Sequence, residues 1–336
     1  MSRPASVPRA IAAIGVILGA LAGPPLRAQG ARGAGRPLPV APPSRAESLL
    51  AVGRLRAAED ALYAAVDAAP REPSARGELG RYLASRARFV IADILFGEAL
   101  RFGADTARVA EALLAIAPYR PEVDRRRIPG ARLSPAEAGR ERARVEARGG
   151  RADAAIAGAP VTVPMIFLTD GRGIGSFEVR GPGGARRAVL DPAVQGVRLA
   201  RADDAALAPR SFGATGRGAP LLLPQLEIGA RTLEAVEARV DPDLPPDEVR
   251  LGFDVLWALA PVFDERAGTM TLPAERARRV PGAATQVPMA LGFPGIWLVP
   301  AVGRPPVPIA SVEGRALLGG ARWWWDASSA TIVVQR

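Results

Sequence analysis

The stretch RAVLDPAVQGVRL, from Arg187 to Leu199, places a single acidic residue between two apolar runs. The first run, Ala188 to Leu190, leads directly into Asp191, and the residues from Pro192 to Gly196 separate it from the second run. Short apolar runs interrupted by turn-forming residues are typical of β-strands joined by a tight loop. The stretch therefore predicts a strand, a loop that begins with Asp191, and a second strand.

The sequence around this stretch alternates between apolar and polar residues and is rich in turn signals. Alternation with a period of two is the pattern of strands that bury one face. It predicts strands at Thr162 to Thr169, Gly175 to Arg180, Arg186 to Leu190, Leu221 to Leu223, Leu226 to Ile228 and Leu233 to Val240, and a closing hairpin from Val262 to Leu272. We also expect a short polar helix near Asp203 and another from Phe253 to Leu259, directly after Leu251 and Gly252.

Two of these features together resemble the retropepsin-like aspartic peptidases, in particular the exported bacterial members. They are the Asp191 loop and the Leu251-Gly252 pair with a short helix behind it. The resemblance covers roughly Thr162 to Pro273 and implies a mostly antiparallel β barrel over residues 161–275. It also implies that Asp191 is the catalytic acid and that Leu251 and Gly252 form the floor of the site. An unrelated antiparallel barrel is the alternative.

The Asp191 loop departs from this family at two positions. Pro192 and Ala193 stand where the family has a hydroxyl residue and a glycine. In the family the hydroxyl residue bonds across to the opposite loop, and proline has neither a hydroxyl nor a backbone N–H with which to do so. The change at Ala193 is milder, because its N–H can still point at the Asp191 carboxylate.

Aspartic peptidases need two carboxylates that share one proton, so a second acid has to come from elsewhere. Asp105-Thr106 resembles half of the motif, but it begins a predicted helix and is better interpreted as a helix cap. Two hypotheses follow. Either the protein binds a peptide or protein ligand without efficient catalysis, or it is an active aspartic endopeptidase whose homodimer brings together Asp191 from each subunit.

The composition excludes several other kinds of chemistry. The 336 residues include no cysteine, histidine, lysine or asparagine, which excludes disulfides, zinc fingers, cysteine nucleophiles, Ser-His-Asp triads and Walker A loops. We expect no cofactor and no metal, and we interpret the acids from Asp241 to Glu248 as a solvated loop whose spacing is not that of an EF-hand. The net charge is +10, but no aromatic residues are interleaved with the arginines, so we expect no nucleic-acid partner.

The first 28 residues have the three parts of a signal peptide. Arg3 and Arg9 are basic, Ile11 to Ala22 is an apolar run too short to span a bilayer, and Leu26 to Ala28 offers a cleavage site. An uncleaved membrane anchor is the alternative. Residues 29–44 are rich in glycine, proline and arginine and predict a flexible lead-in. We therefore expect a periplasmic or secreted protein with no membrane span once the signal is removed.

Residues 45–119 have helical periodicity and an internal spacing of 34 residues. The first unit has Ala58, Leu62, Ala65 and Pro70, and the second has Ala92, Phe96, Ala99 and Ala104, preceded by Leu79 and Gly80. This resembles a short tetratricopeptide module capped by a third helix, Thr106 to Ile116. A plain helical hairpin is the alternative. The fold class we predict is therefore α+β and multidomain, with helical hairpin repeats followed by a retropepsin-like β barrel.

Residues 120–160 predict a linker with one helix. Ser134-Pro135-Ala136-Glu137 is a capping box with proline at the first helical position, so a helix should run from Pro135 to about Arg148. Its alternating arginine and glutamate residues suggest a solvated face.

Residues 276–336 repeat pieces of the β domain. Three short sequences recur. Val287-Pro288-Met289 matches Val163-Pro164-Met165, and Leu318-Gly319 matches Leu251-Gly252. The stretch from Asp326 to Val334 matches the one from Asp264 to Leu272. The part of the repeat where a second acid would stand is missing. We expect either a degenerate partial second lobe or a β extension, with at least one ring of Trp323, Trp324 and Trp325 buried against the sheet.

Overall fold

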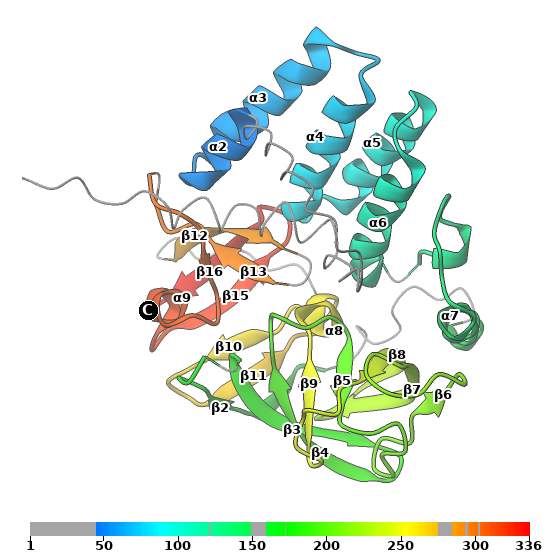
Figure 1. Ribbon diagram of the computed structural model, residues 1–336. Coiled ribbons are helices and arrows are strands. Elements are labelled where there is room, and N and C mark those ends of the chain that lie inside the picture. Colours follow the sequence, from blue (N-terminus) through cyan, green and yellow to red (C-terminus); the bar gives the residue numbers. More distant parts are fainter. Residues whose placement is uncertain are drawn as a thin grey trace, which may run out of the picture.

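The computed structural model describes residues 45–120, 122–148, 159–171, 173–274, 284–292, 295–301 and 303–336. The predicted signal peptide and lead-in, residues 1–44, lie outside the described residues. The helices of residues 45–116 occupy one side of the molecule and the β-sheets the other, with the C-terminal strands beside the first β domain (Figure 1). Within the described ranges, no helix combines the length and the apolar character that a membrane span requires.

The N-terminal helices pack as consecutive neighbours. They are α2 (Arg45–Ala51), α3 (Leu55–Ala68), α4 (Pro73–Ser85), α5 (Phe89–Arg101) and α6 (Thr106–Ile116), followed by the 3-10 turns η2 (Ala117–Tyr119) and η3 (Arg125–Arg127) and by α7 (Pro135–Arg148). A Cβ on Gly80 would lie 2.8 Å from the Phe96 ring, so glycine lets α4 and α5 approach closely. The helices predicted from Thr106 and from Pro135 are confirmed, whereas the tetratricopeptide assignment stays a prediction.

Side chains cap two of these helices as the sequence predicts. Asp105 accepts hydrogen bonds from the backbone N–H groups of Ala107 and Arg108, so it is a helix cap. At the start of α7, the Ser134 hydroxyl accepts from the Glu137 N–H at 3.2 Å, and the Glu137 carboxylate accepts from the Ser134 N–H at 3.1 Å.

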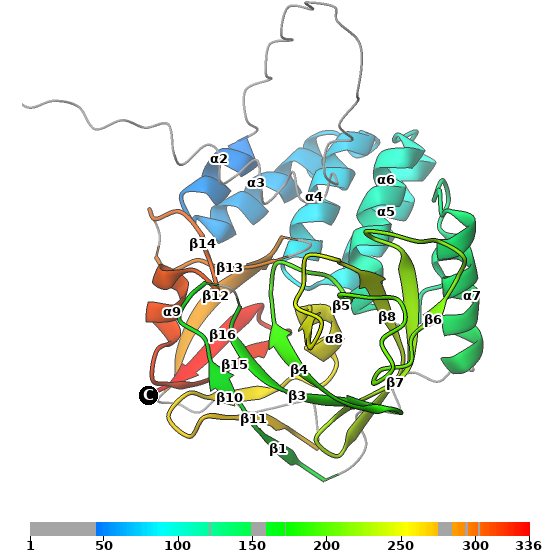
Figure 2. The same cartoon turned by 60° about the horizontal axis from the view of Figure 1, so that its bottom comes forward.

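Six strands of the β domain close into a barrel in the order β3-β4-β9-β5-β8-β7, with β7 returning to β3 through the pairing of Arg180 with Glu227. The strands around it are β2 (Ile166–Phe167), β3 (Gly175–Gly181), β4 (Gly184–Leu190), β5 (Val197–Leu199), β6 (Arg210–Ser211), β7 (Pro220–Ile228), β8 (Arg231–Val240) and β9 (Glu248–Leu251). Most pairings are antiparallel, but β4–β9 and β5–β8 are parallel. Figure 2 shows the barrel in a second view, with the bottom of Figure 1 turned forward.

Four details of the β domain differ from the sequence prediction. The strand expected from Thr162 to Thr169 is interrupted at Met165, and its two parts, β1 (Val161–Pro164) and β2, belong to different sheets. No helix forms near Asp203; the Asp204 carboxylate instead caps a turn that ends at Ala208, whose φ is +45°. The two strands expected on either side of Pro224 are one continuous strand, β7. The short helix α8 (Phe253–Trp257) ends before Leu259.

The second sheet contains two matching sets of three strands. Its order is β1-β11-β10-β15-β16-β12-β13-β14. The strands are β1 (Val161–Pro164), β10 (Val262–Asp264), β11 (Thr269–Leu272), β12 (Thr285–Leu291), β13 (Ile296–Leu298), β14 (Val307–Pro308), β15 (Arg322–Asp326) and β16 (Thr331–Gln335). The sets β1-β11-β10 and β12-β16-β15 meet where β10 pairs with β15. Pro164 pairs with Thr269 in the first set and Pro288 with Thr331 in the second, so the register repeats as well.

One of the expected sequence matches, that of Leu318-Gly319 with Leu251-Gly252, is wrong in structural terms. Leu251 lies in a strand, and Gly252 precedes the helix that follows it. Leu318 instead is the last residue of the helix α9 (Val312–Leu318), and Gly319 follows that helix. Both pairs are a leucine followed by a glycine, but they lie at opposite ends of their helices.

An aromatic cluster joins the helices to both sets of strands. Trp257 of α8 stacks on Trp325 of β15 at 5.7 Å between ring centroids and contacts Phe89 and Tyr119 from the helical side. All three tryptophans of β15 are buried. Stacked and edge-to-face rings of this kind contribute about 0.5–1.5 kcal/mol per pair beyond their buried area. The helical and β parts therefore share a core.

Candidate functional site

Asp191 directly follows strand β4, at the end of the barrel where β4 and β9 both end. Leu190 pairs with Leu251 in the parallel β4–β9 ladder, and the Asp191 N–H donates to the Leu251 carbonyl at 2.9 Å. The structure thus brings together Asp191, Leu251 and Gly252, the residues that the sequence resemblance places in one site. The Asp191 residue is only 6% exposed.

The Asp191 carboxylate has two hydrogen-bond donors, one on each oxygen. The Ala193 N–H donates to Oδ1 at 2.8 Å, in the direction expected from the sequence. Arg250 Nη1 donates to Oδ2 at 2.6 Å and forms an ion pair with it. Pro192, which stands between Asp191 and Ala193, has no backbone N–H to donate. The carboxylate is therefore held by its own loop and by a cation from β9.

Sequence reasoning missed Arg250. In the sequence it is an ordinary polar residue between the buried Val249 and Leu251. The parallel pairing of β9 with β4 aligns Arg250 with Val189, two residues before Asp191, and so brings the guanidinium to the carboxylate. A signal was available in the two-residue alternation of β9, which predicts that Arg250 points out of the barrel.

Gly252 is required by close packing under the loop. A Cβ at this position would lie 2.5 Å from the Val194 carbonyl oxygen and 2.3 Å from Asp254 Oδ1. The Gly252 N–H donates to the Gly196 carbonyl at 2.8 Å. Any larger residue would push the end of the Asp191 loop away from α8.

A second acid, Asp254, holds the other end of the loop and was also missed. Both of its oxygens accept the Gly196 N–H, at 3.0 and 2.9 Å. Burial raises the pKa of Asp254 to about 7, although these hydrogen bonds favour the charged form. Next to Gly196, the Gln195 amide donates to the Ala115 carbonyl of α6 at 3.2 Å. The loop is thus fixed by α8 from within the β domain and by α6 from the helical side.

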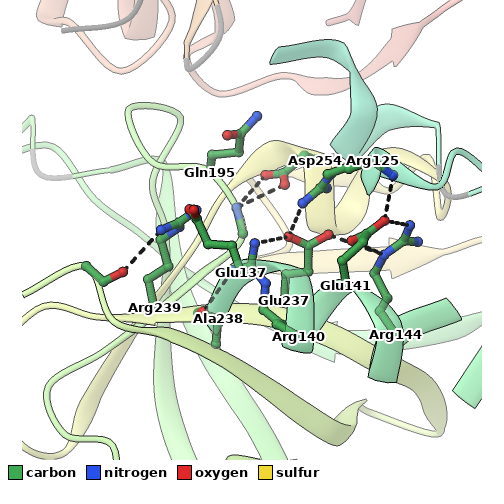
Figure 3. Close-up of polar contacts among 12 residues, drawn as sticks. Arg125, Glu137, Arg140, Glu141, Arg144, Gln195, Glu237, Ala238, Arg239 and Asp254 are labelled. Atoms are coloured by element: carbon green, nitrogen blue, oxygen red, sulfur yellow. Dashed lines mark hydrogen bonds and ion pairs between the residues drawn. The ribbon is translucent and has the colours of Figure 1, made fainter. Parts of the chain in front are cut away.

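A network of charges lies beside Asp254, between α7 and β8 (Figure 3). Glu237 of β8 forms ion pairs with Arg125 at 2.5 Å, with Arg140 at 3.2 Å and with Arg144 at 3.7 Å. Burial alone would raise the pKa of Glu237, but the three arginines hold it well below its usual range. The expectation of a solvated face on α7 holds for Arg142 and Glu146, which are exposed, but is wrong for Arg140, Glu141 and Arg144, which are buried.

The C-terminal segment at the end of β13 (Ile296–Leu298) has no acid at the position that matches Asp191. Its sequence Leu298-Val299-Pro300-Ala301 matches Leu190-Asp191-Pro192-Ala193 with valine in place of the acid. Val299 is 3% exposed, and a Cβ on Gly53 would lie 2.9 Å from it, so the α2–α3 turn packs directly on this segment.

The arrangement limits the chemistry that the described residues can perform. Among them, no carboxylate is hydrogen-bonded to Asp191, and no group of three or more acids stands close enough to hold a metal ion. In the acidic loop, Asp241 and Asp243 form ion pairs with Arg217.

Comparisons with known proteins give a weak likeness to solved structures. No family model matches the chain, and no curated protein matches it. Among solved structures, it is similar to the crystal structure of a retropepsin-like aspartic protease from Rickettsia conorii, with 18% sequence identity over 34% of this chain and 89% of that one and a TM-score of 0.24. A likeness this weak adds nothing to the geometry of the Asp191 loop.

Proposed function

We propose that the protein binds a peptide or protein segment at the Asp191 loop without hydrolysing it. The observation that carries this proposal is the 2.6 Å ion pair between Arg250 and Asp191. A peptidase of the aspartic type needs one carboxylate to activate water while a second, protonated carboxylate stabilises the carbonyl oxygen. Here each oxygen of the Asp191 carboxylate already accepts one hydrogen bond, Oδ2 from the positively charged Arg250 and Oδ1 from the Ala193 N–H, and no second carboxylate among the described residues is hydrogen-bonded to it.

The alternative is an active homodimer with Asp191 from each subunit. One observation favours the binding protein over it. The edge of β10 already pairs with β15 of the same chain, so this edge is closed to the strands of another copy. The matching segment of the C-terminal repeat has Val299 in place of the acid, so this segment does not supply a second carboxylate within one chain.

A peptide library tests the proposed function. The purified mature protein is incubated with a mixed peptide library from acidic to neutral pH, and both cleavage products and peptides retained on the protein are identified by mass spectrometry. We expect intact peptides to be retained and no cleavage above that of the Asp191→Asn variant. Cleavage by the wild type that disappears in Asp191→Asn would establish a peptidase instead.

We also propose that the protein acts in the periplasm or outside the cell. The signal-like sequence of residues 1–28 and the lack of cysteine support this location. N-terminal sequencing of the protein from fractionated cells should give a chain that begins near Gln29. A chain that begins at Met1 in the cytoplasmic fraction would contradict it.

A further inference from the structure

Three arginines stand side by side across the strands next to the Asp191 loop. Arg198 of β5 pairs in register with Arg250 of β9 on one side and with Arg239 of β8 on the other. Residues in register on neighbouring strands point to the same face, and strands lie about 4.8 Å apart. Val197 and Leu199, on either side of Arg198, are buried in the barrel, so this arginine row faces outward.

The two outer arginines of the row have partners. Arg250 is paired with Asp191, and its Nε lies 3.5 Å from Glu248 Oε1. Arg239 Nη2 forms an ion pair with Glu137 of α7 at 2.9 Å, and its Nη1 donates to the Gly218 carbonyl (Figure 3).

The central arginine differs from its neighbours. Across the described part of the chain, the side chain of Arg198 has no hydrogen-bond or ion-pair partner. Burial lowers the pKa of Arg198 and the charge of Arg239 lowers it further, whereas Asp241 and Asp254 act in the opposite direction. A half-buried guanidinium without an acceptor carries a desolvation cost that an anion would offset.

The row remains open to a ligand. The side chains of Arg250 and Arg239 are 25% and 33% exposed, and Arg198 is partly exposed as well. Among the described residues, Asp191 and Glu248 lie against Arg250 and Glu137 lies against Arg239, so the Arg198 guanidinium is the member of the row left to receive an anion. A single free guanidinium favours a carboxylate, with one negative charge, over a phosphate group, with nearly two.

We propose that the arginine row binds an acidic residue of an extended peptide, with Arg198 as the anchor for its carboxylate. The inference rests on the proposed function and names the chemistry of its ligand. A guanidinium matches a carboxylate with two parallel hydrogen bonds, which gives direction as well as charge. Acidic residues at every second position of an extended peptide point to one side about 6.6–6.8 Å apart, a spacing that can reach Arg198 and one of its neighbours.

Binding is measured by fluorescence anisotropy with a labelled peptide of alternating alanine and glutamate, and with the same peptide carrying glutamine in place of glutamate. We expect the acidic peptide to bind more tightly than the neutral one. Arg198→Gln should weaken binding of the acidic peptide about tenfold or more, since it removes a charged hydrogen-bond donor. Arg180→Gln is the matched control, because Arg180 is an exposed arginine of β3 outside the row and should leave affinity unchanged.

The possible results separate this inference from the proposed function. Equal binding of both peptides, or no effect of Arg198→Gln in a variant whose thermal melt shows that it is folded, would overturn the acidic-peptide site and leave a peptide-binding protein. Inorganic phosphate that displaces the peptide at equal concentration would show a general anion site and would also overturn it. If neither peptide binds and the peptide library yields no retained peptide, both proposals fail.

Discussion

At the scale of single residues, the Arg250–Asp191 pair decides between binding and catalysis, and its strength can be measured. Asp191 is nearly buried, whereas Arg250 keeps a quarter of its side chain exposed. Removing one partner of a buried pair costs about 3–5 kcal/mol, because the remaining charge is left uncompensated. With Arg250 partly exposed, we expect Arg250→Met to lower the free energy of unfolding by about 2 kcal/mol in urea denaturation.

A double-mutant cycle isolates the pair. In the Asp191→Asn background, Arg250→Met should cost much less, because no buried charge is left behind. The exposed pair of Arg201 with Asp203 is the control, and the same cycle there should give no measurable coupling. Equal costs of Arg250→Met in both backgrounds would mean that the two side chains do not interact in solution.

Asp254 should make stability depend on pH. Its pKa is about 7 in the folded protein and near its ordinary value of 3.8 in the unfolded chain. Between these values the folded state holds a proton that the unfolded state has lost, so this group's stabilisation is complete below about pH 4 and is lost as the pH rises through 7. At about 1.4 kcal/mol per pKa unit, and with part of the side chain exposed, we expect a loss of about 2 kcal/mol.

Asp254→Asn should remove this loss, because asparagine can still accept the Gly196 hydrogen bond but does not ionise. The measurement is the free energy of unfolding of both proteins at several pH values from 4 to 7.5. Parallel pH profiles of wild type and variant would show that Asp254 ionises normally in the folded state.

The sequence could predict only part of this site. Asp191, Leu251 and Gly252 come together as predicted, and the Ala193 N–H points at the carboxylate. Arg250 could not be predicted, because its contact with Asp191 joins residues 59 apart and depends on a parallel pairing of β4 with β9. A pattern of alternating residues shows which face a side chain takes but not which strand lies beside it.

At the scale of elements, helix α7 is docked on β8 by charge. Glu237 is paired with three arginines, and its pKa is held far below 4.5, so its stabilisation is present above that pH and is lost as the pH falls below it. We expect Glu237→Gln to lower the free energy of unfolding by about 3 kcal/mol at pH 7, since it leaves buried arginines without their counter-ion. The difference from wild type should shrink toward pH 3.

Glu234→Gln is the matched control for Glu237→Gln. Glu234 lies on the same strand but is exposed, so its substitution should change stability by less than about 0.5 kcal/mol. Similar effects of the two substitutions would contradict a docking role for Glu237.

The helix boundaries of this region were predictable, but the environment of α7 was not. The capping box at Ser134 and Glu137 is a local signal, and the helix begins where that signal indicates. Its charged face looks solvated in the sequence because the counter-ion, Glu237, is more than ninety positions away along the chain. Only the packing of α7 on the barrel turns an apparent surface into an interface.

At the scale of the whole molecule, the C-terminal repeat pairs with the β10 edge and so closes it to the strands of another chain. The strand sets β1-β11-β10 and β12-β16-β15 match in order and register, and they meet through three residue pairs between β10 and β15. The helices cover the outer side of the second set, where the Val52 carbonyl accepts from the Gly303 N–H and Arg86 donates to the Met289 carbonyl. One chain thus builds both sides of the sheet.

We therefore expect the mature chain to be a monomer in analytical ultracentrifugation at micromolar concentration. A chain that ends before residue 276 should instead self-associate or aggregate, because it exposes the β10 edge together with the face of Trp257 that stacks on Trp325. A shortened chain that stays monomeric and folded would mean that the C-terminal strands are not needed to close the sheet. A full-length dimer that cleaves peptides would favour the homodimeric peptidase over the binding protein, provided that Asp191→Asn abolishes the cleavage and leaves the dimer intact.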